Sequence, residues 1–185
     1  MSRSADETVR RHRHTERRHM IRVKDALAAG LEGDAPEEFL LACTDYLAYI
    51  IGRFRMQARR NLEGLKPRVE AADDEEGRRV MADIEATMER TGQALDVLTR
   101  AAAGRARPGG SEAFRAAARG FVDFYASVLA ARKDPAQDII ARHFDAEEYW
   151  TLTDDVTPES VATERTLYAR VIALAPEGMA PPVDD

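Results

Sequence analysis

Apolar residues recur along this chain at spacings of three and four, whereas alternation with a period of two is nearly absent. Spacing of that kind places apolar side chains on one stripe of an α-helix, so the pattern predicts helices throughout. The predicted helices run from 6 to 29, from a cap at Asp34 to about 65, from the acidic residues 73–76 past 98, from a cap at Ser111 to Pro135 and on to His143, and from Thr157 to about 174.

The segments between these helices carry ordinary start and stop signals. Gly30 and Gly33 are expected to end the first helix, Pro67 the second, and the glycine-rich stretch 104–110 forms a loop. Four long helices with short joins predict an all-α fold, an antiparallel four-helix bundle with additional short C-terminal helices. We expect residues 1–175 to form a single helical-bundle domain, followed by a flexible acidic tail over 176–185.

Composition supports a helical protein and excludes several classes. The chain has 185 residues, a length that suits one domain with its own core. Of these residues, 44% are hydrophobic, 32% are charged and 6% are aromatic. Cys43 is the only cysteine, which excludes a disulfide framework and a cysteine-based zinc site. No apolar run approaches the ~18 residues of a membrane span, and the arginine-rich start lacks the apolar stretch of a signal peptide. We therefore expect a cytoplasmic protein without a membrane span.

Charge is distributed unevenly along the chain. The net charge is −6, yet the first 24 residues contain eight arginines and lysines against three acids. Arg10, Arg13 and Arg17 are interpreted as the solvated outer face of the first helix. Nucleic-acid binding is the less favoured alternative, because the arm has no interleaved aromatic residues and no helix-turn-helix pattern, and the acidic remainder repels a polyanion.

Three polar residues interrupt the apolar stripe of the first helix. His12, Glu16 and His19 lie on one face together with Val9 and Val23 through spacings of three and four. Two histidines and one carboxylate are the ligand types suited to iron or manganese, and Glu-x-x-His spacing is used by metal sites in helical bundles. The set is a candidate metal site. The alternative is that these first turns project past the bundle into water.

Arginines flank the apolar stripes of two other helices. Arg55 and Arg59 follow the stripe of the second long helix, and Arg132 ends that of the fourth. Their stems can lie on apolar surface with the charged ends in water. Alternatively, the three converge with Glu85 of the third helix and form a buried ion network or a binding site for an anion. Arg55, Arg59, Glu85 and Arg132 are therefore the candidate ligand-binding residues.

Nucleophilic catalysis has little support in the sequence. Cys43 lies on a core stripe without an evident base, and neither a Gly-x-Ser-x-Gly motif nor a phosphate-binding glycine loop is present. His143 and Glu147 are four residues apart, but Asp145 between them is typical of a helix cap that would separate them. These features favour a binding protein over an enzyme.

The layout resembles the hemerythrin-like family, four-helix bundles that hold a non-haem di-iron centre. The similarity lies in the aromatic segment 121–125 (FVDFY) and in the later segment 140–150 (IARHFDAEEYW), and it covers most of residues 9–152. The resemblance implies the fold of the family and a metal site in the interior of the bundle.

The family's ligands are largely replaced in this chain. On the second helix, where the family has a His-x-x-x-Glu pair, this chain has Arg55 and Arg59. On the fourth helix the corresponding pair is replaced by Val128 and Arg132, and the histidine of the third helix falls near Glu85. Cations cannot take the place of ligands around Fe²⁺, so the resemblance implies a bundle that has lost its di-iron site.

The sequence thus predicts a hemerythrin-like bundle that acts as a binding, sensing or interaction module without a cofactor. Its partner would be a small anionic ligand or another protein. The alternative is a metal-dependent protein that handles oxygen or electrons through non-haem iron or another divalent metal, bound by the rearranged set His12, Glu16 and His19.

Overall fold

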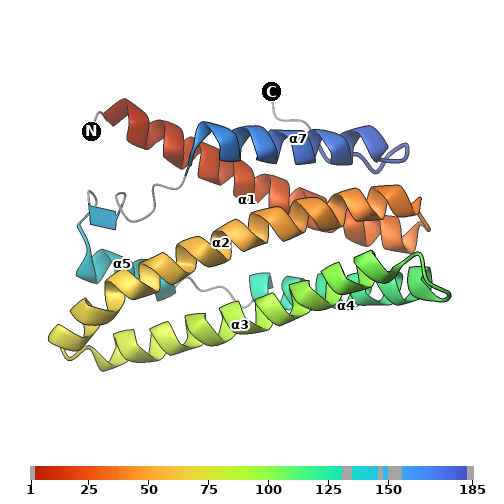
Figure 1. Ribbon diagram of the computed structural model, residues 1–185. Helices are drawn as coiled ribbons and strands as arrows, with labels where there is room; N and C mark the ends of the chain where they lie inside the picture. The colour runs from red at the N-terminus through yellow and green to blue at the C-terminus, as the bar shows by residue number, and fades with distance from the viewer. Residues whose placement is uncertain (1–2, 131–134, 146–147, 150–155, 183–185) are drawn as a thin grey trace.

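The computed structural model describes residues 3–130, 135–145, 148–149 and 156–182, and its regular elements in these ranges are all α-helices (Figure 1). This confirms the predicted all-α class. The helices are α1 (Arg3–Glu32), α2 (Glu37–Ala71), α3 (Glu75–Gly104), α4 (Gly110–Ala130), α5 (Pro135–His143) and α7 (Pro158–Leu174).

Four long helices pack in a closed order. α1 contacts α2 and α4, and α3 contacts the same two helices, so each of the four touches two neighbours. Consecutive helices run in alternating directions in Figure 1. α7 lies along α2 and also touches α1, while α5 packs against α3 and α2. These contacts are consistent with the predicted four-helix bundle.

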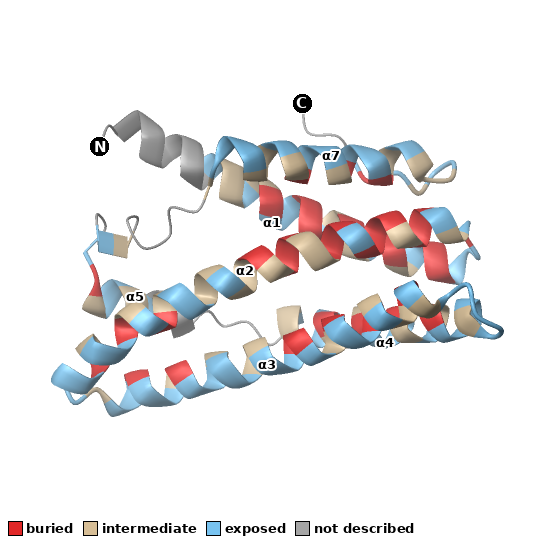
Figure 2. Ribbon diagram, in the orientation of Figure 1, coloured by how far each residue is buried: buried red, intermediate tan, exposed pale blue. Residues whose placement is uncertain are grey.

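The buried side chains form two separate apolar clusters. The larger cluster joins α1, α2, α3, α4 and α7 around residues such as Leu27, Leu47 and Phe121. The smaller one joins α2, α3 and α5 through Leu65, Met81 and Ile139, together with other residues. Figure 2 shows buried positions along α2 in both regions. α2 therefore spans two cores, and the stretch between them leaves room for a site.

Two predicted helix boundaries in the α2 region are wrong. Pro67 lies inside α2, although a proline removes one helical hydrogen bond. The helix continues because Leu65 and Val69, on either side of the proline, are both buried in the smaller cluster. Asp34 does not cap α2: it has a φ of 52° and pairs with Arg115, and the residue before the helix is Pro36.

Two predicted helix starts are confirmed. Asp74 caps α3 by accepting a hydrogen bond of 2.9 Å from the backbone N–H of Gly77, and this bond and a second one from His143 lower the pKa of Asp74 to about 2. Thr157 starts α7 with a reciprocal capping box, in which its side chain and that of Ser160 bond each other's backbone N–H groups. Local sequence thus sets both starts.

Loss of the α7 cap has a defined expected cost. Thr157→Ala should lower the free energy of unfolding by about 1 kcal/mol, because it removes the acceptor for the Ser160 N–H at the start of α7. Thr166→Ala is the matched control, since Thr166 is exposed within the same helix and bonds only back to Ala162. Urea denaturation measures both variants, and equal losses would show that the cap contributes nothing specific.

The chain continues past α7 along the surface of α1. The carbonyl of Pro182 accepts hydrogen bonds from Tyr168 at 2.8 Å and from Arg22 at 3.1 Å, and Met179 packs against the larger cluster. The flexibility predicted for 176–185 stays a prediction, although these contacts tie residues up to 182 to the body. Among the described helices, none combines the length and apolar character needed to cross a membrane.

Candidate functional site

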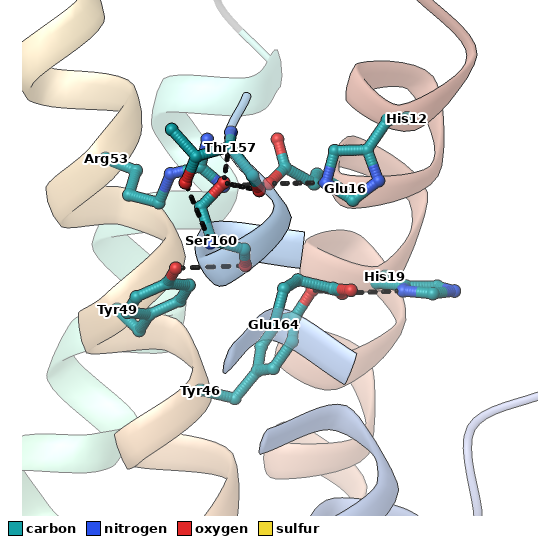
Figure 3. Close-up of polar contacts among 9 residues, drawn as sticks. All are labelled: His12, Glu16, His19, Tyr46, Tyr49, Arg53, Thr157, Ser160 and Glu164. Carbon is teal, nitrogen blue, oxygen red and sulfur yellow. Dashed lines mark hydrogen bonds and ion pairs between the residues drawn. The ribbon is translucent and has the colours of Figure 1, made fainter. Parts of the chain in front are cut away.

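Glu16 of α1 lies inside the protein, with only 1% of its surface exposed. The guanidinium of Arg53, on α2, donates a hydrogen bond to its Oε1 atom, and His12 Nε2 donates to the same atom at 3.2 Å (Figure 3). Arg53 is itself buried. A buried carboxylate needs such partners, because its desolvation is otherwise too costly. Glu16, the middle polar residue of the predicted face, thus joins α1 to α2.

Glu164 of α7 forms the second buried contact. Its Oε1 atom accepts a hydrogen bond of 2.8 Å from Nδ1 of His19 and another of 2.8 Å from the hydroxyl of Tyr46. The ring of Tyr168 stacks on His19, with centroids 3.7 Å apart and planes 8° apart. Figure 3 shows Glu164, His19 and Tyr46 converging from three helices. One carboxylate therefore fixes α7 to both α1 and α2.

The pKa shifts of this cluster agree with its geometry. Burial by itself raises the pKa of Glu164, but the hydrogen bonds from His19 and Tyr46 outweigh it and hold the pKa below the ordinary 4.5. Burial, reinforced by the charge of Glu164, raises the pKa of Tyr46. The phenol therefore stays protonated, and its O–H group donates a hydrogen bond to Glu164. Glu164 is therefore ionised at neutral pH and accepts both hydrogen bonds.

His12, Glu16 and His19 share one face of α1, as the sequence predicts, but they belong to two separate networks. The charge of Arg53 lies against the Glu16 carboxylate, and Glu164 accepts a hydrogen bond from Nδ1 of His19. A divalent cation does not fit beside a bound guanidinium, because like charges repel. Within the described ranges, no three His, Cys, Asp or Glu side chains are grouped to hold a metal ion.

The predicted arginine cluster is only partly assembled. Arg55 points inward and lines a cavity, whereas the side chains of Arg59 and Glu85 are exposed and lie outside its lining. Arg132 falls outside the described residues. The structure therefore does not bring Arg59 and Glu85 to Arg55. The reason is that both sit at the edge of their helix stripes, where long charged side chains reach water.

The cavity lies between the two apolar clusters and has a volume of about 630 Å³. All five of α1 to α5 contribute to its wall, and α2 and α3 supply most of it. On α2 the apolar stripe is interrupted here by Arg55, Ala58 and Asn61, which are polar or small. The break in the hydrophobic pattern and the cavity therefore coincide.

Two residues of the cavity wall each have a buried polar atom without a hydrogen-bond partner among the described residues: Arg55 at Nε and Asn61 at Oδ1. Gly92 of α3 makes room for the guanidinium of Arg55. A Cβ atom at Gly92 would lie 2.2 Å from Nη2 of Arg55, so any side chain there would displace the guanidinium. Buried polar groups are nearly always satisfied, which makes this pair a place where a ligand can bind.

Sequence reasoning missed the partners that complete the networks. Glu164 lies three residues after Val161 and four before Tyr168 on the apolar stripe of the last helix, so the spacing rule that found Glu16 identifies it too. Arg53, three residues after Ile50, carries the same signal. Tyr46 gave none, because a tyrosine on an apolar stripe is ordinary core.

Two other candidate groups have simple roles. Burial raises the pKa of the Cys43 thiol to about 12, which keeps it protonated and unreactive. His143 bonds Asp74 at 2.8 Å, and Asp145 accepts from the backbone N–H of Glu148, as expected of a cap. Glu147 lies outside the described residues.

Comparisons with protein-family models, with curated proteins and with solved structures found no match to this chain.

Proposed function

We propose that this protein is a ligand-binding module, built as a four-helix bundle of the hemerythrin-like type whose di-iron site has been replaced. The observation that carries the proposal is the cavity beside Arg55. Its volume of about 630 Å³ falls within the range of small-molecule sites, and its wall combines apolar side chains with polar and charged ones. A small ligand supplies the acceptor that the buried Nε of Arg55 lacks within the described residues.

The resemblance noted in the sequence supports the same place for the site. Arg55 and Val128 occupy positions where hemerythrin-like bundles have metal ligands, and both line the cavity. The charge of Arg55 favours an anionic group and repels a metal ion, and the apolar Val128 suits the organic part of such a ligand. The proposal accordingly includes no metal cofactor.

A cavity-filling variant tests whether small molecules bind there. A library containing acids, bases and neutral compounds is screened by thermal shift against the native protein, Ala58→Phe and Ala82→Phe. Ala58 lines the cavity, whereas Ala82 is exposed on α3 and serves as the matched control. We expect compounds that stabilise the native protein and the Ala82 variant but leave the Ala58 variant unchanged, because binding to the folded state raises its stability.

Two results would contradict the proposal. The first is the absence of any compound whose effect depends on position 58, provided that circular dichroism shows the variant to be folded. Ser127→Leu fills the opposite wall from α4 and replaces Ala58→Phe if that variant does not fold. The second is stoichiometric iron with oxo-bridge absorption in protein purified without a histidine tag, which would restore the metal-dependent alternative.

A further inference from the structure

We propose that the ligand of this cavity is an amphipathic carboxylate, with its carboxylate on the guanidinium of Arg55 and its apolar body along the neighbouring wall. This inference rests on the proposed function and adds the chemical class of the ligand. It follows from the charges, the shape and the apolar surface of the cavity wall.

The charged groups of the wall favour an anion. Arg17, Arg55 and Arg90 line the cavity, against a single acid, Asp83. Arg90 bonds its own helix, through the carbonyl of Ala86 and the hydroxyl of Thr87. Arg17 and Asp83 are both exposed. Arg55 is therefore the cation that faces the interior with a buried donor to offer.

The position of Arg55 is set by shape. Gly92 leaves the space that its guanidinium fills on α3, and Cβ of any larger residue would collide with Nη1, Nη2 and Cζ. A guanidinium held in this way is oriented before the ligand arrives, so less entropy is lost on binding. Its planar set of donors matches a carboxylate.

Part of the remaining wall is apolar, and this part suits the body of an organic ligand better than a small inorganic anion. Phe54, Ile84, Met88 and Phe124 line the cavity, together with Ile140 of α5 and Tyr149. Arg17 and Arg90 also line the cavity but are exposed, so the second charge of a phosphate dianion would gain little from them in water. A carboxylate has one charge, which Arg55 meets, and an alkyl or aryl body gains by covering the apolar side chains.

Matched amphiphiles separate charge from apolar character. Dodecanoate, dodecanol, dodecyltrimethylammonium and inorganic phosphate are titrated below micelle-forming concentrations, with binding followed by isothermal calorimetry. We expect dodecanoate to bind at least ten times more tightly than dodecanol, and the cation and phosphate to bind more weakly than either. Hydrogen bonds to a charged group account for a difference of about ten- to a hundredfold.

Variants at Arg55 assign the selectivity to this residue. Arg55→Met should reduce the affinity for dodecanoate at least tenfold and leave that for dodecanol unchanged, and Arg55→Lys should fall between. Arg59→Met, one turn further on the exposed side of α2, is the control and should bind as the native protein does. Gly92→Ala should weaken binding by displacing the guanidinium, whereas Gly120→Ala, with open space around its Cβ position, should not.

The outcomes distinguish failure of this inference from failure of the proposed function. If dodecanol or the cation binds as tightly as dodecanoate, and Ala58→Phe abolishes that binding, the cavity is a ligand site but the carboxylate is wrong. If dodecanoate binding survives Arg55→Met, Arg55 does not hold the head group and the inference is also wrong. If neither these probes nor the screened library bind in a way that depends on position 58, the proposed function itself fails.

Discussion

Glu164→Ala is expected to lower the free energy of unfolding by about 3–5 kcal/mol, one of the two largest single effects in this protein. The substitution leaves His19 and Tyr46 without the acceptor that both share, at 2.8 Å each, in a site where Glu164 is 1% exposed. Buried donors without an acceptor destabilise the folded state by their full desolvation cost. In addition, α7 loses its polar link to α1 and α2. Urea denaturation at pH 7 measures the difference.

A second variant and a pH series test the cause. Glu159→Gln removes an exposed charge from the same helix and should cost less than about 1 kcal/mol. Because the pKa of Glu164 is lowered on folding, its contribution is complete above the ordinary value of 4.5 and is lost as pH falls through the folded-state pKa. The gap between native protein and Glu164→Ala should therefore narrow below pH 4.5. Two results would contradict this role of Glu164. The first is that Glu164→Ala lowers the free energy of unfolding no more than Glu159→Gln does, and the second is that the difference between the native protein and Glu164→Ala increases in acid.

Arg53→Met should lower the free energy of unfolding by a similar amount, about 3–5 kcal/mol, because it leaves the buried Glu16 carboxylate without its guanidinium partner. Among the described residues, His12 is the hydrogen-bond partner that remains to Glu16, at 3.2 Å and partly exposed. Arg59→Met is the control for loss of an arginine from α2, and we expect a change within about 0.5 kcal/mol at that exposed position.

The double variant Glu16→Leu, Arg53→Met separates the two costs. Replacing a buried ion pair with apolar side chains is often neutral or stabilising, so the double variant should recover most of what Arg53→Met loses. Such recovery is a coupling between the two positions that additive effects do not give. A double variant less stable than either single variant would show that the side chains act independently and that Glu16 has other essential partners.

The sequence by itself determined the helices and which side chains share a face. Three- and four-residue spacing places His12, Glu16 and His19 together on α1, and the cap residues Asp74 and Thr157 set the starts of α3 and α7. These features depend on contacts within one or two turns, which local residue order controls. Pro67 shows the limit of local rules, since burial of its neighbours in the smaller cluster carries α2 past it.

Only the tertiary structure decided what each face meets. Arg53 and Arg55 are two residues apart on α2, about 200° around the helix, so they point to opposite sides. Spacing shows that they differ in direction, but the packing of α2 between α1 and α3 decides that Arg53 meets Glu16 and that Arg55 enters the cavity beside Gly92. The same holds for His19, whose partner Glu164 is 145 residues away along the chain. Partners across helices depend on how whole helices rotate and dock against each other, and no local pattern encodes that rotation.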